Sequence, residues 1–171
     1  MNMAISDTVP DWKREQKTPG RYEPAKHLLA TIRAYQRLRS NGGIIARIAS
    51  PFVVLQHRFW SAVTGADIPL NSNIGGGLLM PHPNGIVVHP DAEIGPNCIF
   101  FQQVTIGTGG RIPGTPVIAG HVDIGAGARI LGGVTIGAHA RIGANAVVID
   151  DVPAHTTAVG IPARLPGQQG K

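Results

Sequence analysis

A six-residue hydrophobic period runs through the second half of the chain. From position 118 onward an aliphatic residue recurs at every sixth place: Ile118, Ile124, Ile130, Ile136, Ile142 and Val148. Four places after each of them stands a small or β-branched residue: Val122, Ala128, Val134, Ala140, Ala146 and Val152. Helices repeat at about 3.6 residues and strands at about 2, so this period fits neither a helical bundle nor a flat sheet. It predicts a solenoid in which three short strands, one for each period, make a coil.

The same period extends toward the N-terminus with one slip of two positions. Its earlier positions are Val88, Ile94, Phe100 and Ile106 and, before the slip, Ile68, Ile74, Met80 and Ile86. Cys98 falls in the second register, so we expect it in the core rather than in a reactive site. Residues 107–116 contain four Gly and two Pro, which predicts a loop extruded from the solenoid.

Apolar residues of the first segment recur at helical spacing instead. The first helical stripe consists of Leu28, Leu29, Ile32, Tyr35 and Leu38. The stretch from Ile44 to Val63 predicts a second helix, bent at Pro51. We expect these helices to cap the open first coil of the solenoid, as end units must. The alternative is a basic surface that contacts a membrane or another polyanion.

Composition supports a division near position 65. Residues 1–65 hold 10 Lys and Arg against 4 Asp and Glu, whereas residues 66–171 hold 5 against 6 and most of the glycine. We therefore predict a helical segment at 1–65, a β-helix domain at 66–164 and a flexible tail at 165–171. The net charge of +5 belongs to the helical segment, and nucleic acid is not expected as a partner.

The sequence also bears on redox chemistry and location. A single cysteine excludes an intramolecular disulfide, and no CxxC pair offers a zinc site. Positions 1–17 lack the apolar core of a secretory signal, and no run of about 20 apolar residues predicts a transmembrane helix. A cytoplasmic protein is the expectation.

Five segments of the solenoid carry a family resemblance: residues 66–68, 80–88, 103–107, 124–132 and 157–164. Together they resemble the hexapeptide-repeat acyltransferases and, within that family, the serine acetyltransferases. The resemblance implies a mainly β fold, a single-stranded left-handed parallel β-helix with an N-terminal α-helical cap. It also implies acetyl-CoA as co-substrate, no metal, and a homotrimer with its sites between subunits.

The resemblance places two catalytic residues. His82 stands where the family has its general base, and Asp67, at the family's spacing before it, stands where the family has the carboxylate that orients it. Such a carboxylate fixes the imidazole tautomer and stabilises the imidazolium. The implied reaction is direct transfer: His82 deprotonates an acceptor hydroxyl, whose oxygen attacks the acetyl-CoA thioester.

The resemblance also places the acetyl-CoA groove. Thr108, Gly109, Ala126 and Ala144 match positions at which small residues let the backbone approach the ligand. Arg164 is expected to reach the CoA phosphates.

Two departures from the family bear on the acceptor. Pro81 replaces an Asp that holds the amino acid, and Gly114-Thr115-Pro116 replaces an Arg-His-Pro triplet that supplies a carboxylate partner and a second histidine. An uncharged hydroxyl would not need these charges. The sequence therefore favours a sugar or polysaccharide unit as acceptor. Serine O-acetyltransferase of cysteine biosynthesis is the alternative, with Arg111 as a source of positive charge.

Two other functions remain open. His121 and His139 are three periods apart and are expected to stack, which suits a metal-dependent enzyme like carbonic anhydrase if a third ligand joins them. His89 and His155 are expected at the surface or in a subunit contact. A non-catalytic trimeric β-helix scaffold is the other alternative, and Thr115 in place of a histidine favours it.

Overall fold

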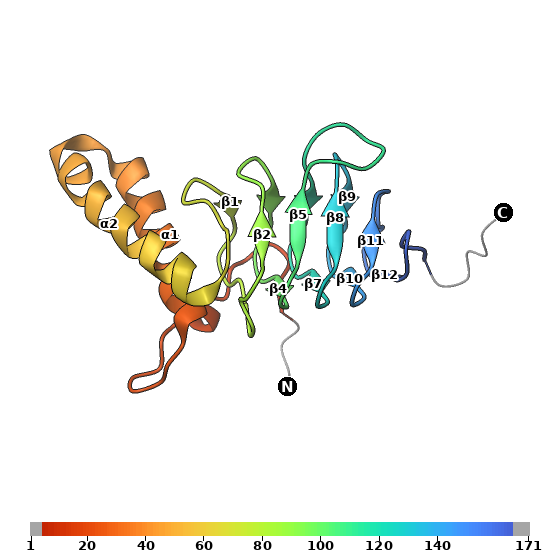
Figure 1. Cartoon of the computed structure of the whole chain (residues 1–171), viewed down its shortest axis with the longest axis horizontal. Coiled ribbons are helices and arrows are strands. Elements are labelled where there is room, and N and C mark those ends of the chain that lie inside the picture. Colours follow the sequence, from red (N-terminus) through yellow and green to blue (C-terminus); the bar gives the residue numbers. More distant parts are fainter. Residues whose placement is uncertain (1–4, 166–171) are drawn as a thin grey trace.

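A computed structural model describes residues 5–165, in which two helices lead into a series of short strands (Figure 1). The 3-10 helix η1 (Trp12–Glu15) comes first, followed by α1 (Pro24–Asn41) and α2 (Gly43–Thr64). Proline suits the first turn of α1, because the N–H that it lacks would have no partner in the helix there. Gly65, in the left-handed region at φ 65°, ends α2. Both expected helices are present, and α2 continues through Pro51.

The strands form three parallel sheets, which are the three sides of a β-helix. The first sheet contains β1 (Asn73–Ile74), β3 (Glu93–Ile94), β6 (Val117–Ile118) and β9 (Thr135–Ile136). The second contains β4 (Ile99–Phe100), β7 (Asp123–Ile124), β10 (Arg141–Ile142) and β12 (Thr157–Ala158). The third contains β2 (Val87–Val88), β5 (Thr105–Gly107), β8 (Arg129–Leu131) and β11 (Val147–Val148).

Strand pairing follows the period seen in the sequence. Ile124 lies opposite Ile142, three periods further along the chain. Ile74 lies opposite Ile94, two positions beyond three periods, which accounts for the slip. All aliphatic positions of both registers are at most 4% exposed. Each strand thus puts one large side chain into a narrow core, and the small residues of the second register leave room for it. The prediction of a mainly β solenoid is confirmed.

Cys98 lies in this core and is fully buried. Burial raises the pKa of its thiol to about 11, so the reactive thiolate is scarce at neutral pH. The expected core role of Cys98 is confirmed.

The extruded loop is also present, between β5 and β6, and it projects from the side of the β-helix (Figure 1). Two backbone hydrogen bonds attach it to the next coil: Gly132 N–H donates to Gly107 O at 2.9 Å, and Gly133 N–H donates to Ile112 O at 2.9 Å. The loop is therefore attached to the next coil at its start and near its middle, while most of its residues are exposed to solvent.

The coils turn through residues in the left-handed backbone region, and these residues recur from coil to coil. The corners between the first and second sheets carry Asn97, His121, His139 and His155, with φ between 55° and 63°. Non-glycine residues seldom adopt this region, and Asn and His are among those that tolerate it best. The coil repeat places the histidines of three successive corners in one column, which brings the three rings near one another.

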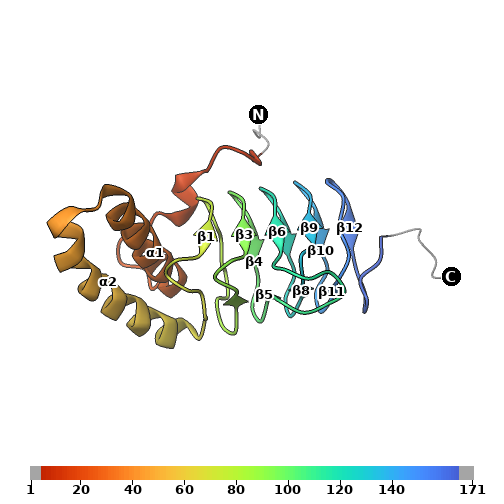
Figure 2. The same cartoon turned by 90° about the horizontal axis from the view of Figure 1, so that it is seen from above.

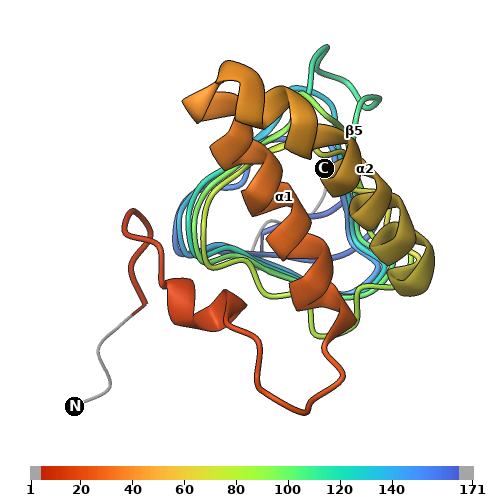
Figure 3. The same ribbon diagram turned by 90° about the vertical axis from the view of Figure 1, so that its left-hand side faces the viewer.

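Helix α1 packs across the β1 end of the β-helix (Figures 2 and 3). Leu28, Leu29 and Ile32 are at most 1% exposed and belong to the same buried cluster as Ile68 and Ile74 of the first coil. At the other end Leu165 packs against the core. The rest of the predicted tail, residues 166–171, lies outside the described residues. Within residues 5–165 no helix is long and apolar enough to cross a bilayer.

Candidate active site

His82 lies in the turn that leads into β2, between Pro81 and Pro83, and its side chain is exposed. The turn is held by Gly85, which has φ 71° and donates its N–H to Gly65 O at 2.8 Å. Gly65 itself has φ 65°, in the left-handed region that favours glycine, and it lies against Asn84. The segment that carries His82 is therefore docked on the residues that precede the first coil.

Asp67 is held by backbone pairing with the next coil. Its N–H donates to Ile86 O at 2.8 Å, and its carbonyl accepts from Val88 N–H at 3.0 Å. The side chain is exposed. The backbones that carry Asp67 and His82 thus lie in adjacent coils, but no ion pair within 4.0 Å joins them among those of the described residues.

His57 is a second histidine near Asp67 that sequence reasoning missed. Only 8% of it is exposed, and its Nδ1 lies 2.9 Å from Thr31 Oγ1, across the contact between α2 and α1. Burial lowers the pKa of His57, while the Ile68 backbone and the charge of Asp67 oppose that shift. His57 lies one helical turn after the buried Val53, and this spacing could have shown that it faces inward.

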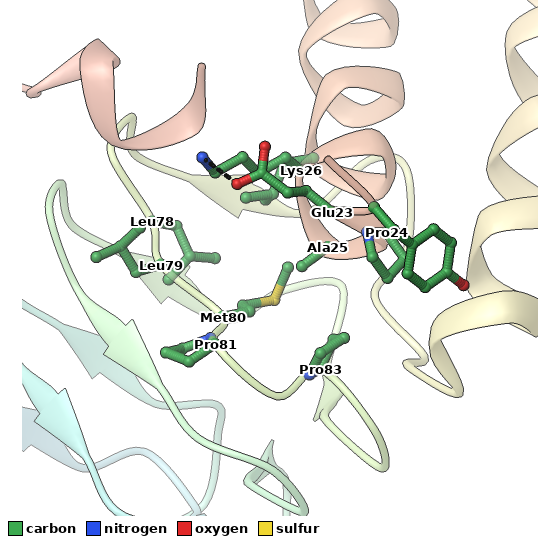
Figure 4. A pocket seen from close by; sticks show the side chains of 11 residues that line it. Glu23, Pro24, Ala25, Lys26, Leu78, Leu79, Met80, Pro81 and Pro83 are labelled. Atoms are coloured by element: carbon green, nitrogen blue, oxygen red, sulfur yellow. Dashed lines mark ion pairs between the residues drawn. The ribbon is translucent and has the colours of Figure 1, made fainter. Parts of the chain in front are cut away.

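A pocket of about 210 Å³ lies beside the His82 turn (Figure 4). Pro81, Pro83 and Met80 form one side, and the start of α1 forms the other. There Glu23 and Lys26 make an ion pair at 2.9 Å. His82 itself does not line the pocket. The sequence pattern did not predict this pocket, because the two sides of the pocket come from segments far apart in the chain.

Ala126 and Ala144 occupy the same corner of successive coils, between the second and third sheets. The carbonyl of Ala126 accepts from Asn145 N–H at 2.8 Å, which holds the two turns in register. Ala126 is half-buried and Ala144 is exposed. Thr108 and Gly109, in contrast, are exposed in the extruded loop, which follows the C-terminal end of β5, whereas Ala126 and Ala144 precede the N-terminal ends of β8 and β11 in the same sheet. One chain therefore does not bring these four residues together.

Arg164 near the C-terminal end and Thr115 and Arg111 of the extruded loop each have a partner within the chain. Arg164 pairs with Val159 through two backbone hydrogen bonds of 2.8 and 3.0 Å, and its side chain is exposed. The hydroxyl of Thr115 donates to Asp91 O at 3.0 Å, so this residue anchors the loop. Arg111 lies 3.8 Å from Asp150. The Asp150 carboxylate therefore partly neutralises the Arg111 guanidinium, which the alternative of serine as acceptor would use as its positive charge.

The histidines of the coil corners form a column. His121 and His139 lie one above the other in adjacent coils, as expected, with their Nδ1 atoms 2.7 Å apart and their rings edge to face at 75°. His155 continues the column, with its ring parallel to that of His139 at 4.7 Å between centroids. Burial lowers the pKa of His121, and the neighbouring His139 adds to the effect. Among residues 5–165 no three His, Cys, Asp or Glu side chains are grouped so that they could hold a metal ion.

This chain is similar to serine acetyltransferases. It is 43% identical over 110 residues to the serine acetyltransferase of Bacillus pumilus, a match that covers 63% of this chain and 51% of that protein. Soybean serine acetyltransferase complexed with serine superposes with a TM-score of 0.70 and 38% identity, over 83% of this chain and 57% of that one. A serine acetyltransferase complex with CoA has a TM-score of 0.70 and 33% identity, over 84% and 57%. No protein-family model matches the chain.

These matches cover part of each relative. The chain spans about half the length of the curated serine acetyltransferases that it matches. A superposition over 83% of this chain must include most of the β-helix, because the six-residue period occupies more than half of the sequence.

Proposed function

We propose that this chain is an acetyl-CoA-dependent O-acetyltransferase of the serine acetyltransferase type. The observation that carries the proposal is its 38% identity and TM-score of 0.70 to a serine acetyltransferase complexed with serine. A left-handed turn of the β-helix and a capping role for α1 and α2 follow from the same proposal. The buried contact of Leu28 and Leu29 with the first coil supports that cap.

In the proposed reaction His82 takes the proton of the acceptor hydroxyl. The oxygen then attacks the thioester carbonyl carbon, and a backbone N–H stabilises the resulting oxyanion. Collapse of the tetrahedral intermediate expels the CoA thiolate, which recovers the proton from the imidazolium. Asp67 is the proposed positioning residue for His82. Exposure of both side chains in a single chain supports a site that is completed by a second subunit.

We propose a homotrimer with its sites between subunits. Thr108 and Gly109 lie at one edge of the third sheet, and Ala126 and Ala144 lie at the other. A groove between two subunits would bring the loop of one chain against the alanine corner of its neighbour, and acetyl-CoA would lie there. Arg164 would then be available to the CoA phosphates.

Serine is the acceptor that the similarity favours, over the sugar that the sequence departures favoured. A sugar hydroxyl remains the second candidate because Pro81 and Thr115 carry no charge for a zwitterion, and Thr115 is already bonded to Asp91 O. Arg111 is 65% exposed in its side chain and can turn away from Asp150, which supports serine.

The test is release of free CoA from acetyl-CoA by the purified protein, with serine or with a panel of free and nucleotide-linked sugars. Serine-dependent release above the hydrolysis background supports the first candidate. Release only with a sugar supports the second. Equal release by wild type and His82→Ala with every acceptor would favour the non-catalytic scaffold and overturn both.

A further inference from the structure

Helix α2 exposes a continuous apolar face, which we call the α2 stripe. Its side chains are between 39% and 74% exposed and recur at intervals of three or four positions: Ile44, Ile48, Phe52, Leu55, Phe59 and Val63. The opposite face of the helix carries Val53, His57 and Thr64, which are buried against the rest of the protein. A continuous apolar stripe on a helix normally packs against a partner. Within the described residues this stripe is turned to solvent.

The charge around the stripe has one sign. From Pro24 to Ala66 the chain contains six Lys and Arg and no Asp or Glu. Lys26 and Arg33 have carboxylate partners in Glu23 and Glu15. The other four basic residues, Arg37, Arg39, Arg47 and Arg58, are exposed, and no ion pair involves them in the described part of the chain.

Three of these arginines lie beside the apolar stripe. Arg39 and Arg47 line a shallow depression of about 430 Å³ together with Ile44. Arg47 and Arg58 line a second depression of about 510 Å³ together with Leu55. Guanidinium groups next to a row of large apolar side chains match the boundary of a bilayer, where lipid phosphates lie above the acyl chains.

We propose that the α2 stripe docks in the plane of a membrane surface that contains anionic lipid. Helix α2 has 22 residues and is about 33 Å long, so the stripe can lie flat along the interface. Charge decides against the alternative that a second copy of the chain covers it. Two such faces in contact would bring several arginines together with no carboxylate between them, whereas an anionic leaflet attracts each one.

The experiment is vesicle co-sedimentation of the full chain. The probes are pure phosphatidylcholine vesicles and vesicles with about 30% phosphatidylglycerol, at about 0.1 M and about 0.5 M salt. Wild type is expected to bind the anionic vesicles and to bind less at high salt. The double variant Phe52→Ser with Phe59→Ser is expected to lose at least about tenfold in partitioning. Arg47→Gln with Arg58→Gln is expected to lose the dependence on anionic lipid.

Tyr22→Ser is the matched control, because Tyr22 is an aromatic side chain that is 78% exposed outside the stripe. It should partition like wild type. Ile48→Ser with Leu55→Ser replaces the phenylalanine variant if circular dichroism shows that the latter is unfolded. Failure of wild type to bind anionic vesicles, or equal binding by folded stripe variants, overturns the proposal. A lower assembly mass of the stripe variants in sedimentation velocity without vesicles would assign the face to a second copy, and also overturns it.

Discussion

Arg33 and Glu15 form a two-pronged ion pair that ties three parts of the molecule together. Arg33 Nε donates to Glu15 Oε2 at 3.0 Å, and a terminal guanidinium nitrogen donates to Oε1 at 2.8 Å. The guanidinium also donates to the Ile74 and Gly75 carbonyls of the first coil. Glu15 Oε1 in turn accepts from Gly77 N–H at 2.7 Å. The pair therefore joins η1, α1 and the β1 coil.

Removing one partner of this pair should be costly, since it leaves the other charge buried. The two side chains are only 10% and 9% exposed. Arg33→Ala is expected to lower the free energy of unfolding by about 3–5 kcal/mol, measured by urea denaturation. Arg37→Ala is the matched control on the same helix, and as an exposed residue it should change by less than about 0.5 kcal/mol. Equal effects of the two variants would contradict the linking role of Arg33.

Asn97 clamps the N-terminal segment onto the β-helix. Its Oδ1 accepts from Asp11 N–H at 2.7 Å, and its Nδ2 donates to the carbonyls of Ser6 and Val9 at 2.7 and 2.8 Å. Asn97→Gly keeps the φ of 63° accessible but removes all three bonds. We expect trypsin to cleave near Lys13 at least about tenfold faster than in wild type, and mass spectrometry of the fragments measures this rate.

The control for that prediction is Asn145→Gly. Asn145 has nearly the same backbone conformation, with φ 56°, and is exposed at another coil corner. If both variants are cleaved at the wild-type rate, the N-terminal segment does not depend on the Asn97 side chain.

Acid should weaken the fold through His57, which is buried, and His121, which is half-buried. Burial lowers the pKa of His57 and of His121 below the ordinary value of 6.5. The unfolded chain then binds these protons more tightly than the folded chain does. The stability is therefore complete above about pH 6.5 and falls as the pH drops below it. Urea denaturation between pH 7.5 and pH 5 is expected to show that loss.

Single variants show which histidine causes the loss of stability in acid. His121→Asn should reduce the slope without straining the backbone, because Asn97 already occupies the equivalent corner position at φ 63°. His57→Gln should reduce it further. A slope that neither histidine variant changes would mean that other groups carry the pH dependence.

Catalysis should depend on His82 far more than on any other surface histidine. His82→Ala is expected to lower kcat/KM for acetyl transfer by about 10²- to 10⁴-fold while the unfolding midpoint stays unchanged. His89→Ala is the control and should retain activity. Asp67→Asn discriminates two roles for Asp67. A lower rate of acetyl transfer with an altered pH profile supports a role of Asp67 in positioning His82. Lower stability with an unchanged rate would instead mean that Asp67 acts through its electrostatic interaction with His57.

The sequence predicted the β-helix well because its signal is local and repeats. One inward aliphatic residue in every period suffices to place each strand, the extruded loop between Ile106 and Ile118, and the core position of Cys98. The position of His139 directly above His121 in the next coil follows from the same period of 18 residues for each coil. His155 is exposed, as expected, but its place in the histidine column was not predicted, because its coil reaches the corner two positions sooner than the regular period would place it.

The contacts around the candidate active site could not be predicted from the sequence pattern. His57 approaches Asp67, and the start of α1 forms a pocket with Pro81 and Pro83, through contacts between segments far apart in the chain. Asn97 likewise binds the backbone of Ser6, which lies 91 positions earlier. No periodicity reports such contacts, since each depends on how the helical segment settles on the first coils.

The sequence by itself determined the coil, its core and the two helices, because the burial of one side chain per strand or one stripe per helix is a local property of the chain. Only the tertiary structure decided which face of α2 is buried. Val53 and His57 lie against the protein, and Phe52 and Phe59 lie in solvent. The α2 stripe is the more hydrophobic of the two faces, so hydrophobicity does not predict which face is buried. Packing on α1, where His57 contacts Thr31, decides it.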